Sequence, residues 1–430
     1  MTALPKSAPA ERLAIDGGTP ARQQPDPPMY PGGNIIGAEE EQLVLEVLRT
    51  RRLFRYYGPQ PGPSKVAELE EKFAAFMGVP RAVAVTSGTA ALVCGLAAIG
   101  VGPGDEVIVP AYTWIASAAA VAMVGGIPIL GEVDDSLTLD PEDVARKITP
   151  RTKAIMPVHM RGAPCHMDEL LALAGRHGLH IIEDVAQADG GSYRGQRLGS
   201  LGDVGCFSLQ FNKIITSGEG GLLITSDEKL YQRAVMYHDP IGGLHNNIPA
   251  EEILPGMNFR MPELLAAVGL AQLARLDGLL ETMRAQKRVV KEGMADVLAR
   301  AGGHFRAMTD PAGDTSIALI FFMPTAKLAQ RVSQALNAEN VGAAGMYHPD
   351  RIDYHVYAHW APIMGKRTWT PQGGPWRWGA PVEYSRAMCP RTLDLLSRAV
   401  HLDVNPLLSG NDVEETIIGL NKVLRSVGGA

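Results

Sequence analysis

The chain has 430 residues, a length that allows two or three domains. Hydrophobic residues make up 46% of it and charged residues 20%, a globular composition that excludes intrinsic disorder of the whole chain. Its 40 Lys and Arg residues against 46 Asp and Glu residues give a net charge of −6. A chain of this charge lacks the basic footprint of a general nucleic-acid binder.

Cysteine spacing and hydropathy indicate the compartment. The four cysteines are far apart and form no CxxC pair, so neither a disulfide framework nor a zinc knuckle is expected. The N-terminal sequence has no apolar core of a secretory signal. The long uncharged stretch 107–131 is interrupted by proline and glycine, which favours a strand, a helix and a turn over a membrane span. We therefore expect a soluble cytoplasmic protein with reduced thiols and no membrane partner.

The N-terminal part of the chain predicts an arm, a helix and a loop. Seven prolines in residues 1–33 predict an extended arm that wraps the body or a partner subunit. An amphipathic helix is expected over 38–49. The segment 51–64 is rich in Arg, Tyr, Gly and Pro, and it either lines a site, with Tyr57 as a candidate substrate contact, or is an ordered surface loop.

Short apolar strands then alternate with helices between residues 66 and 233. This alternation predicts an α/β domain with a mostly parallel sheet covered on both faces. The expected strands lie within 81–88, 106–111, 127–134, 153–160, 179–186, 202–209 and 220–227. The expected helices lie within 66–76, 89–100, 116–126 and 168–178.

The rest of the chain predicts a spine and a smaller domain. A long helix over 262–298 is expected to link the two domains. Beyond residue 300, a strand within 315–322, a helix over 326–340, a loop rich in His, Tyr and Trp over 345–376 and a closing helix over 412–427 indicate an α+β domain. The predicted organisation is an arm over 1–33, a large domain over 34–285 and a small C-terminal domain over 286–430.

Loops at the carboxyl ends of parallel strands are where open α/β sheets bind ligands. One such loop, TSGTAAL, places Ser87, Gly88 and Thr89 at the start of a helix. Its backbone N–H groups suit a phosphate, although Ser or Thr at that position is also the ordinary helix cap. The loop is neither a Walker loop nor a GxGxxG fingerprint, so a nucleotide cofactor is not indicated.

Three further strand ends carry unusual residues. Asp184 and Gln187 follow one buried strand, where the carboxylate either meets a cation or caps a turn. Lys213 lies beyond Ser208 near a glycine-rich turn, where it is either a solvated loop residue or a Schiff-base lysine in a dry site. Trp114 follows another strand and either stacks on a planar ring or belongs to the core.

Together these features match the requirements of pyridoxal 5′-phosphate. A lysine for the aldehyde, a carboxylate for the ring nitrogen, a stacking aromatic and a helix N-terminus for the phosphate are what that cofactor needs. An ionised Asp keeps the ring nitrogen protonated, and the ring then acts as an electron sink.

At these residues the chain resembles the DegT/DnrJ/StrS family of pyridoxal-phosphate-dependent aminotransferases of keto-sugars and keto-cyclitols. The motifs TSGTAAL, VIVPAYTW, PVHM, EDVAQ, FSLQFNK, GEGG and NFRM occur in the family's order. The resemblance implies the type I aminotransferase fold and a homodimer with shared active sites. It implies that Lys213 holds the cofactor's aldehyde and that Asp184 partners its ring nitrogen.

The same resemblance assigns the other cofactor contacts. Gln187 lies near the phenolic oxygen and Trp114 stacks on the ring. The phosphate cradle is formed by Ser87, Gly88, Thr89 and Ser208, and Asn258 in NFRM reaches the phosphate of the neighbouring subunit. Some relatives carry His in place of the lysine and act as sugar dehydratases, and Lys213 argues against that activity here.

The chain departs from the family pattern in two places. Asp189 replaces the His of the usual AQAHG sequence, and the segment 345–376 is an unusual His- and Trp-rich elaboration. Tyr347, His348 and His355 in that segment are candidate substrate contacts. His355 and His359 have the i, i+4 spacing of a metal-ligand pair, but no third ligand is evident, and we expect packing or substrate contact and no metal.

The predicted function is transfer of an amino group from an amino acid, glutamate or glutamine, to a keto-sugar or keto-cyclitol. Such a reaction serves amino-sugar, aminocyclitol or other secondary-metabolite biosynthesis, including that of antibiotics. Two alternatives stay open: a pyridoxal-phosphate-dependent dehydratase or aromatising lyase on the same scaffold, and a non-catalytic regulator that binds the cofactor. Only the transaminase requires an amino donor.

Overall fold

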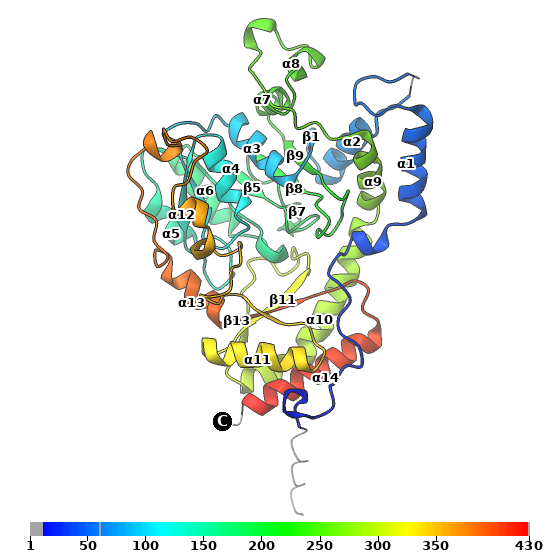
Figure 1. Cartoon of the computed structure of the whole chain (residues 1–430), viewed down its shortest axis with the longest axis vertical. Helices are drawn as coiled ribbons and strands as arrows, with labels where there is room; N and C mark the ends of the chain where they lie inside the picture. Colours follow the sequence, from blue (N-terminus) through cyan, green and yellow to red (C-terminus); the bar gives the residue numbers. More distant parts are fainter. Residues whose placement is uncertain (1–11, 60–61, 429–430) are drawn as a thin grey trace, which may run out of the picture.

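A computed structural model describes residues 12–59 and 62–428 of the chain. Figure 1 shows a seven-stranded sheet in the upper half of the molecule and a four-stranded sheet in the lower half. The larger sheet has the order β1-β9-β8-β5-β4-β2-β3. Its strands are β1 (Arg81–Val85), β2 (Glu106–Pro110), β3 (Ile127–Gly131), β4 (Thr152–Ile155), β5 (His180–Asp184), β8 (Val204–Ser208) and β9 (Gly221–Thr225).

The larger sheet is mostly parallel, as predicted. The pairs β2–β3, β2–β4, β4–β5 and β5–β8 are parallel, and only β9 runs antiparallel to its neighbours β8 and β1. Alternate strand residues enter two separate cores: Ala84 and Ile108 pack on one face, and Val83 and Val109 pack on the other. Burial on both faces explains why the strands read as apolar runs in the sequence.

Helices cover both faces of this sheet. One layer consists of α3 (Gly88–Ala98), α4 (Ala116–Met123) and α7 (Glu228–His238), with α8 (Gly242–His245) beyond it. The other layer includes α2 (Lys65–Met77), α5 (Pro141–Lys147), α6 (Met167–His177) and α9 (Glu263–Leu273), and α1 (Ala38–Thr50) packs outside on α9. A short hairpin of β6 (Ser192–Tyr193) and β7 (Gln196–Arg197) completes this part of the chain.

The smaller sheet has the order β10-β11-β13-β12 and is antiparallel. Its strands are β10 (His304–Phe305), β11 (Ala318–Phe322), β12 (Ala344–Gly345) and β13 (Ala399–Asp403). Its helices are α11 (Ala326–Ala338), α13 (Pro390–Arg398) and α14 (Gly410–Val427). The sequence pattern predicts β11, α11 and α14 but not α13 and β13, and β13 is the strand that pairs with β11.

The predicted spine consists of two helices. After α9, the chain turns at Ala274 and Arg275 and continues as α10 (Leu276–Arg300), which descends to α14 in Figure 1. At this turn the Arg275 guanidinium donates to Glu40 of α1. The stretch that the local pattern predicts as one helix is therefore two helices, with the break beside this contact.

The described part of the N-terminal arm wraps the body of its own chain. It contains two short 3₁₀ turns, Ala14–Asp16 and Gly33–Ile35. The arm is attached to the small sheet's helices, because the N–H groups of Ala14 and Ala21 both donate to the Glu339 carboxylate at 2.8 Å. Residues 1–11, on which the first part of the prediction falls, lie outside the described residues.

The His- and Trp-rich segment between β12 and α13 packs against the large sheet. It contains α12 (Ala361–Met364) and two 3₁₀ turns, Tyr357–His359 and Pro375–Arg377. Its backbone pairs with the segment that follows β2: Thr113 N donates to His355 O and Tyr357 N donates to Ala111 O, both at 3.0 Å. Trp360 is fully buried beneath it. The segment therefore forms a fixed wall beside the end of β2.

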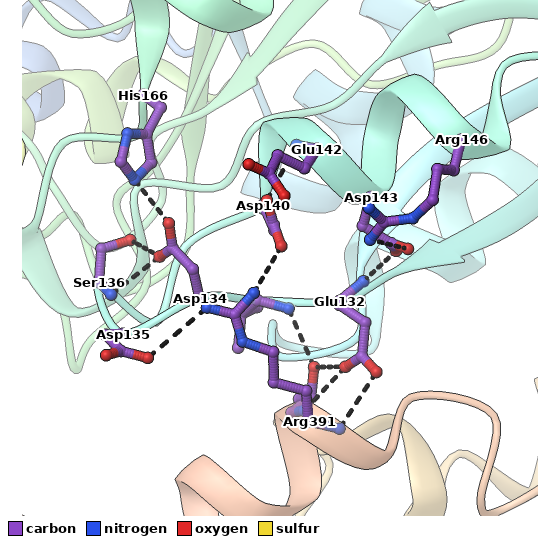
Figure 2. Close-up of polar contacts among 12 residues, drawn as sticks. Glu132, Asp134, Asp135, Ser136, Asp140, Glu142, Asp143, Arg146, His166 and Arg391 are labelled. Carbon is purple, nitrogen blue, oxygen red and sulfur yellow. Dashed lines mark hydrogen bonds and ion pairs between the residues drawn. The ribbon is translucent and has the colours of Figure 1, made fainter.

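A polar network joins the loop after β3 to α13 (Figure 2). Arg391 donates to Asp140 at 2.8 Å, and Thr392 donates to Glu132 at 2.6 Å and accepts from Val133 N at 2.9 Å. These bonds connect the parts of the chain that carry the two sheets. In the described residues, no helix is long and apolar enough to cross a membrane.

Candidate active site

A cavity of about 480 Å³ lies at the carboxyl ends of the central strands of the larger sheet. It lies where the loops after β1, β2, β4, β5 and β8 meet, which is the position expected for a ligand site in this architecture. The residues that line it are Ser87, Gly88, Thr89, Leu92, Thr113, Trp114, Ala116, Val158, Arg161, Asp184, Ala186, Gln187, Ser208, Gln210, Asn212, Lys213, Ile214, Glu219, Ile317 and His355.

The N-terminus of α3 opens into this cavity. Ser87 caps the helix, and its Oγ accepts from Ala90 N at 3.0 Å. A Cβ on Gly88 would lie 2.7 Å from Ser208 Cβ, so only glycine lets the helix start approach the end of β8 this closely. The first backbone N–H groups of a helix have no intrahelical partner. Together with the Ser and Thr hydroxyls they form an anion cradle.

Asp184 ends β5 and is held by neutral donors. Its Oδ2 accepts from Ser117 Oγ at 2.8 Å and its Oδ1 accepts from Ala186 N at 3.1 Å. Burial raises the pKa of Asp184, and the Ser117 hydrogen bond and the Lys213 charge act against that rise. A buried carboxylate that lacks an ion pair is suited to a cationic ligand.

Lys213 lies in the loop between β8 and β9. The loop is closed locally, because Lys213 N donates to Gln210 O and Asn212 N donates to the Gln210 side chain, both at 2.9 Å. Burial lowers the pKa of Lys213, and the charge of Arg161 lowers it further, while Asp189 and Asp184 raise it. A lysine whose pKa is lowered provides more of the neutral amine that attacks a carbonyl.

Trp114 and His355 form one wall of the cavity. The two rings lie 5.0 Å apart at 58°, and Trp114 is 46% exposed. His355 Nδ1 donates to Asp353 Oδ1 at 2.8 Å, an orientation that leaves its Nε2 free for a ligand. Burial lowers the pKa of His355, so the imidazole is neutral near pH 7. Burial acts to raise the pKa of Asp353, but hydrogen bonds from the His355 ring and backbone N–H outweigh it and lower that pKa to about 2.

Most of the residues predicted as a site come together in this cavity. Those that line it are Ser87, Gly88, Thr89, Trp114, Asp184, Gln187, Ser208, Lys213 and His355. Sequence reasoning missed Arg161 and Thr113. Arg161 follows directly on the PVHM segment, and that place in the loop after a predicted strand is the signal that could have found it.

Four predicted residues do not line the cavity of the described chain. Tyr57 is 69% exposed, with its ring 4.9 Å from Phe54. The Tyr347 ring packs 5.6 Å from His359, and His348 is exposed. Asn258 is also exposed, in the extended segment beside the end of α7. The substrate contacts predicted for Tyr57, Tyr347 and His348 thus have no support from this cavity.

His355 and His359 do not form the helical pair that their spacing allows. His355 precedes a 3₁₀ turn, and His359 is buried with its Nδ1 accepting from Asp353 N at 3.0 Å. Within residues 12–59 and 62–428, no group of three or more His, Cys, Asp or Glu side chains has the arrangement of a metal site.

Asp189 is buried beside the cavity. It is 1% exposed, and neither of its carboxylate oxygens has a hydrogen-bond partner in the described structure. The pKa of Asp189 is raised to about 8, mainly by burial. The charge of Asp184 also raises it, and the charge of Lys213 opposes the rise. This residue, which replaces a histidine in the family pattern, therefore adds a titrating carboxyl group next to the lysine.

Comparisons with known proteins show the family of the chain. The model of the DegT/DnrJ/EryC1/StrS aminotransferase family matches residues 34–366. The chain is 41% identical over 304 residues to GDP-perosamine synthase of Caulobacter vibrioides, covering 69% of this chain and 79% of that one. It is 33% identical over 393 residues to L-glutamine:2-deoxy-scyllo-inosose aminotransferase of Streptomyces paromomycinus, covering 89% of each. The crystal structure of DesI in the presence of its TDP-sugar product superposes with a TM-score of 0.76 at 28% identity, covering 97% of each chain.

Proposed function

Because the chain belongs to the DegT/DnrJ/EryC1/StrS aminotransferase family, we propose that it uses pyridoxal 5′-phosphate to move an amino group from glutamate or glutamine to a keto-sugar or keto-cyclitol. The observation that carries this proposal is that Lys213, Asp184 and the N-terminus of α3 face one cavity. An amine, a carboxylate and an anion cradle are the three groups that a phosphorylated pyridine aldehyde requires.

The polar groups that line the cavity fit this cofactor. The close approach of Gly88 to Ser208 leaves a cradle with free helix N–H groups for the phosphate. Asp184, which has hydrogen bonds but no ion pair in the described chain, would hold the protonated ring nitrogen. The exposed face of Trp114 would cover the ring, and Gln187 also lines the cavity.

When bound, the cofactor supplies an electron sink that makes the donor's α-proton acidic. The residues of the chain would provide the rest of the chemistry. The Lys213 amine would hold the cofactor's aldehyde and would move the proton at the donor's α-carbon. The Asp184 carboxylate keeps a proton on the ring nitrogen, and the Ser117 hydroxyl fixes that carboxylate.

The acceptor class follows from the relatives. GDP-perosamine synthase and L-glutamine:2-deoxy-scyllo-inosose aminotransferase are named for an amino sugar and for a cyclitol substrate. Their similarity to most of this chain supports a polyhydroxylated ketone as the acceptor and a role in amino-sugar or aminocyclitol biosynthesis. The Asp353-bound imidazole of His355 provides a neutral hydrogen-bonding group for such hydroxyls.

We also propose that the active unit is a homodimer. Asn258 lies in a segment whose apolar side chains are exposed, with Leu244 at 67% and Met257 at 53%. Figure 1 shows this segment, with α8, standing away from the body. Exposed apolar patches of this kind are typical of an interface. A second copy would cover them and place Asn258 against the phosphate cradle of its partner.

The test is a donor half-reaction. Purified protein supplied with pyridoxal 5′-phosphate is mixed with glutamine or glutamate without any acceptor, and its visible absorbance is followed. Conversion to the pyridoxamine form is expected with at least one donor, with Lys213→Ala as the inactive control. Turnover of a polyhydroxylated ketone without any amino donor would favour a dehydratase or lyase. Cofactor binding with neither reaction would favour a regulator.

A further inference from the structure

Arg161 is a cationic cavity residue that the proposed cofactor contacts leave unused. Among the described residues that line the cavity it is the one arginine. Its guanidinium forms no ion pair in the described part of the chain, and its buried Nε has no hydrogen-bond partner. The guanidinium is half-buried at the cavity, and the carboxylates of the chain reach it only through their charge, which leaves room for an anion from outside the chain.

The backbone at Arg161 is fixed in a strained conformation. The residue has φ 53° and ψ 40°, the left-handed region that non-glycine residues rarely adopt. Such a conformation is strained for a residue with a side chain, and it is common at ligand sites. Two contacts hold it: Arg161 N donates to the Gln187 side chain at 3.3 Å, and Thr315 N donates to Gly162 O at 3.1 Å. The protein thus keeps this arginine at the cavity despite the strain.

Arg161 lies away from the phosphate cradle. Along the carboxyl edge of the sheet, the cradle is at β8, Asp184 ends the neighbouring strand β5, and Arg161 follows the next strand, β4. Adjacent strands are about 4.8 Å apart, so β8 and β4 are separated by about 10 Å. The anion that meets Arg161 is therefore a second one and not the phosphate of the cradle.

Two carboxylates of the chain act on Arg161, but neither forms an ion pair with it in the described part of the chain. Asp353 accepts from His355 at 2.8 Å, and Asp403 is half-exposed. Both act on Arg161 only through their charge. The charge of Arg161 reaches Lys213 as well, so the guanidinium lies near the amine that reacts.

We propose that Arg161 binds the α-carboxylate of the amino donor. This inference rests on the proposed function, since only a transaminase takes an amino acid into this cavity. The planar guanidinium matches a carboxylate with two parallel hydrogen bonds. It fixes the donor so that its amino group faces the Lys213 position. A free keto-sugar or cyclitol carries no anionic group, and a nucleotide-linked sugar carries its charge on a diphosphate and not on a carboxylate, so the proposal assigns Arg161 to the donor.

The first test compares two amines that differ only in the carboxylate. Glutamine and 4-aminobutanamide, which is glutamine without its α-carboxylate, are used in the donor half-reaction of the cofactor-loaded enzyme. The wild type should prefer glutamine, and Arg161→Met should reduce that preference by about 10- to 100-fold, the range for a charged hydrogen-bonded pair. Arg161→Lys keeps the positive charge but not the planar pair of N–H donors. Its preference for glutamine should lie between that of the wild type and that of Arg161→Met. Equal preference in wild type and Arg161→Met would overturn the inference.

The second test needs no reaction. Glutarate, which has carboxylates but no amine, is titrated into wild type and variants by calorimetry, with glutaramide as the neutral control. Wild type should bind glutarate at least tenfold more tightly than Arg161→Met, and glutaramide equally weakly in both. Equal glutarate binding, or none to the wild type, would contradict the role of Arg161. If neither amine reacts with the wild type, the proposed function fails, and glutarate binding still decides whether Arg161 is a carboxylate site.

Discussion

Asp184 and Lys213 face the same cavity but are held differently. The Asp184 carboxylate accepts two hydrogen bonds, from Ser117 at 2.8 Å and from Ala186 N at 3.1 Å, whereas the Lys213 amine is influenced only by charges and burial. The carboxylate therefore has a fixed orientation, and the amine is free to leave and return. That difference suits a carboxylate that holds one proton in place and a lysine that moves another.

Asp184→Asn removes the charge but keeps the shape of the side chain. Without the carboxylate the ring nitrogen loses its proton, so the rate of the donor half-reaction should fall by about 10²-fold or more. The cofactor should still bind, since the cradle and Lys213 are unchanged. Ser117→Ala, which removes one hydrogen bond to Asp184, should lower the rate much less. Stopped-flow absorbance measures both, and a rate for Asp184→Asn within about threefold of wild type would refute the assignment.

Asp189 is predicted to set the reactivity of Lys213. Its negative charge raises the pKa of the lysine, so Asp189→Asn should lower that pKa. The test measures how fast an amine-acylating reagent modifies Lys213 in cofactor-free protein over a range of pH, from the mass of the Lys213 peptide. The midpoint of this pH profile should lie at a lower pH in Asp189→Asn than in wild type. Glu219→Gln is the control, because Glu219 lines the cavity but is exposed. An unchanged or higher midpoint in Asp189→Asn would show that the two groups are not coupled.

At the scale of elements, the His- and Trp-rich segment forms a wall of the cavity because buried hydrogen bonds hold it. Tyr357 is fully buried, and its hydroxyl donates to Arg386 O at 2.8 Å and accepts from Cys389 N at 3.0 Å. The same segment carries Asp353 and His355 to the site. The position of the His355 imidazole thus depends on the contacts of Tyr357 with Arg386 and Cys389, which lie more than 25 residues further along the chain.

Tyr357→Phe should therefore destabilise the protein. It leaves the buried N–H of Cys389 without its partner, at a cost of about 1–3 kcal/mol in the free energy of unfolding. Tyr354→Phe is the matched control, since Tyr354 is 41% exposed and should change stability by less than about 0.5 kcal/mol. Denaturant unfolding followed by circular dichroism compares the two. Equal stability of both variants would mean that the segment is not held by this hydroxyl.

Strands and site residues differ in how well the sequence predicts them. The strands of the larger sheet are buried on both faces, so their apolar runs are visible without the structure, and Asp184 and Lys213 stand out at the strand ends. The residues of β13 include His401 and Asp403, and this strand is defined by its pairing with β11, which is far away in sequence. Arg161 was missed for a similar reason, because its place in the site depends on strand order.

At the scale of the whole molecule, the proposed active unit contains two chains. Asn258 lies 45 positions after Lys213 and is exposed in the single chain. If it completes the cradle of its partner, the cofactor bridges two subunits and should strengthen their association. Asn258→Ala should then weaken both cofactor retention and the dimer, as measured by dialysis and by analytical ultracentrifugation.

Mixing two inactive variants tests this shared site. Lys213→Ala and Asn258→Asp, the latter placing a negative charge against the phosphate, are combined under conditions that allow subunit exchange. Each mixed dimer then has one site with both defects and one with neither, so up to half of its sites should work. Recovered activity would place Asn258 in the partner's site. Absence of recovery, with exchange shown by a mass label, would mean that each site belongs to one chain.

The central claim is that Lys213 carries pyridoxal 5′-phosphate in this cavity. The most direct measurement is borohydride reduction of the cofactor-loaded protein, followed by digestion and mass spectrometry. The predicted result is one modified peptide, with the pyridoxyl group on the lysine that follows Asn212, and no modified peptide in Lys213→Ala. Cofactor fixed on a different lysine, or no fixed cofactor on a protein that retains it, would contradict the account.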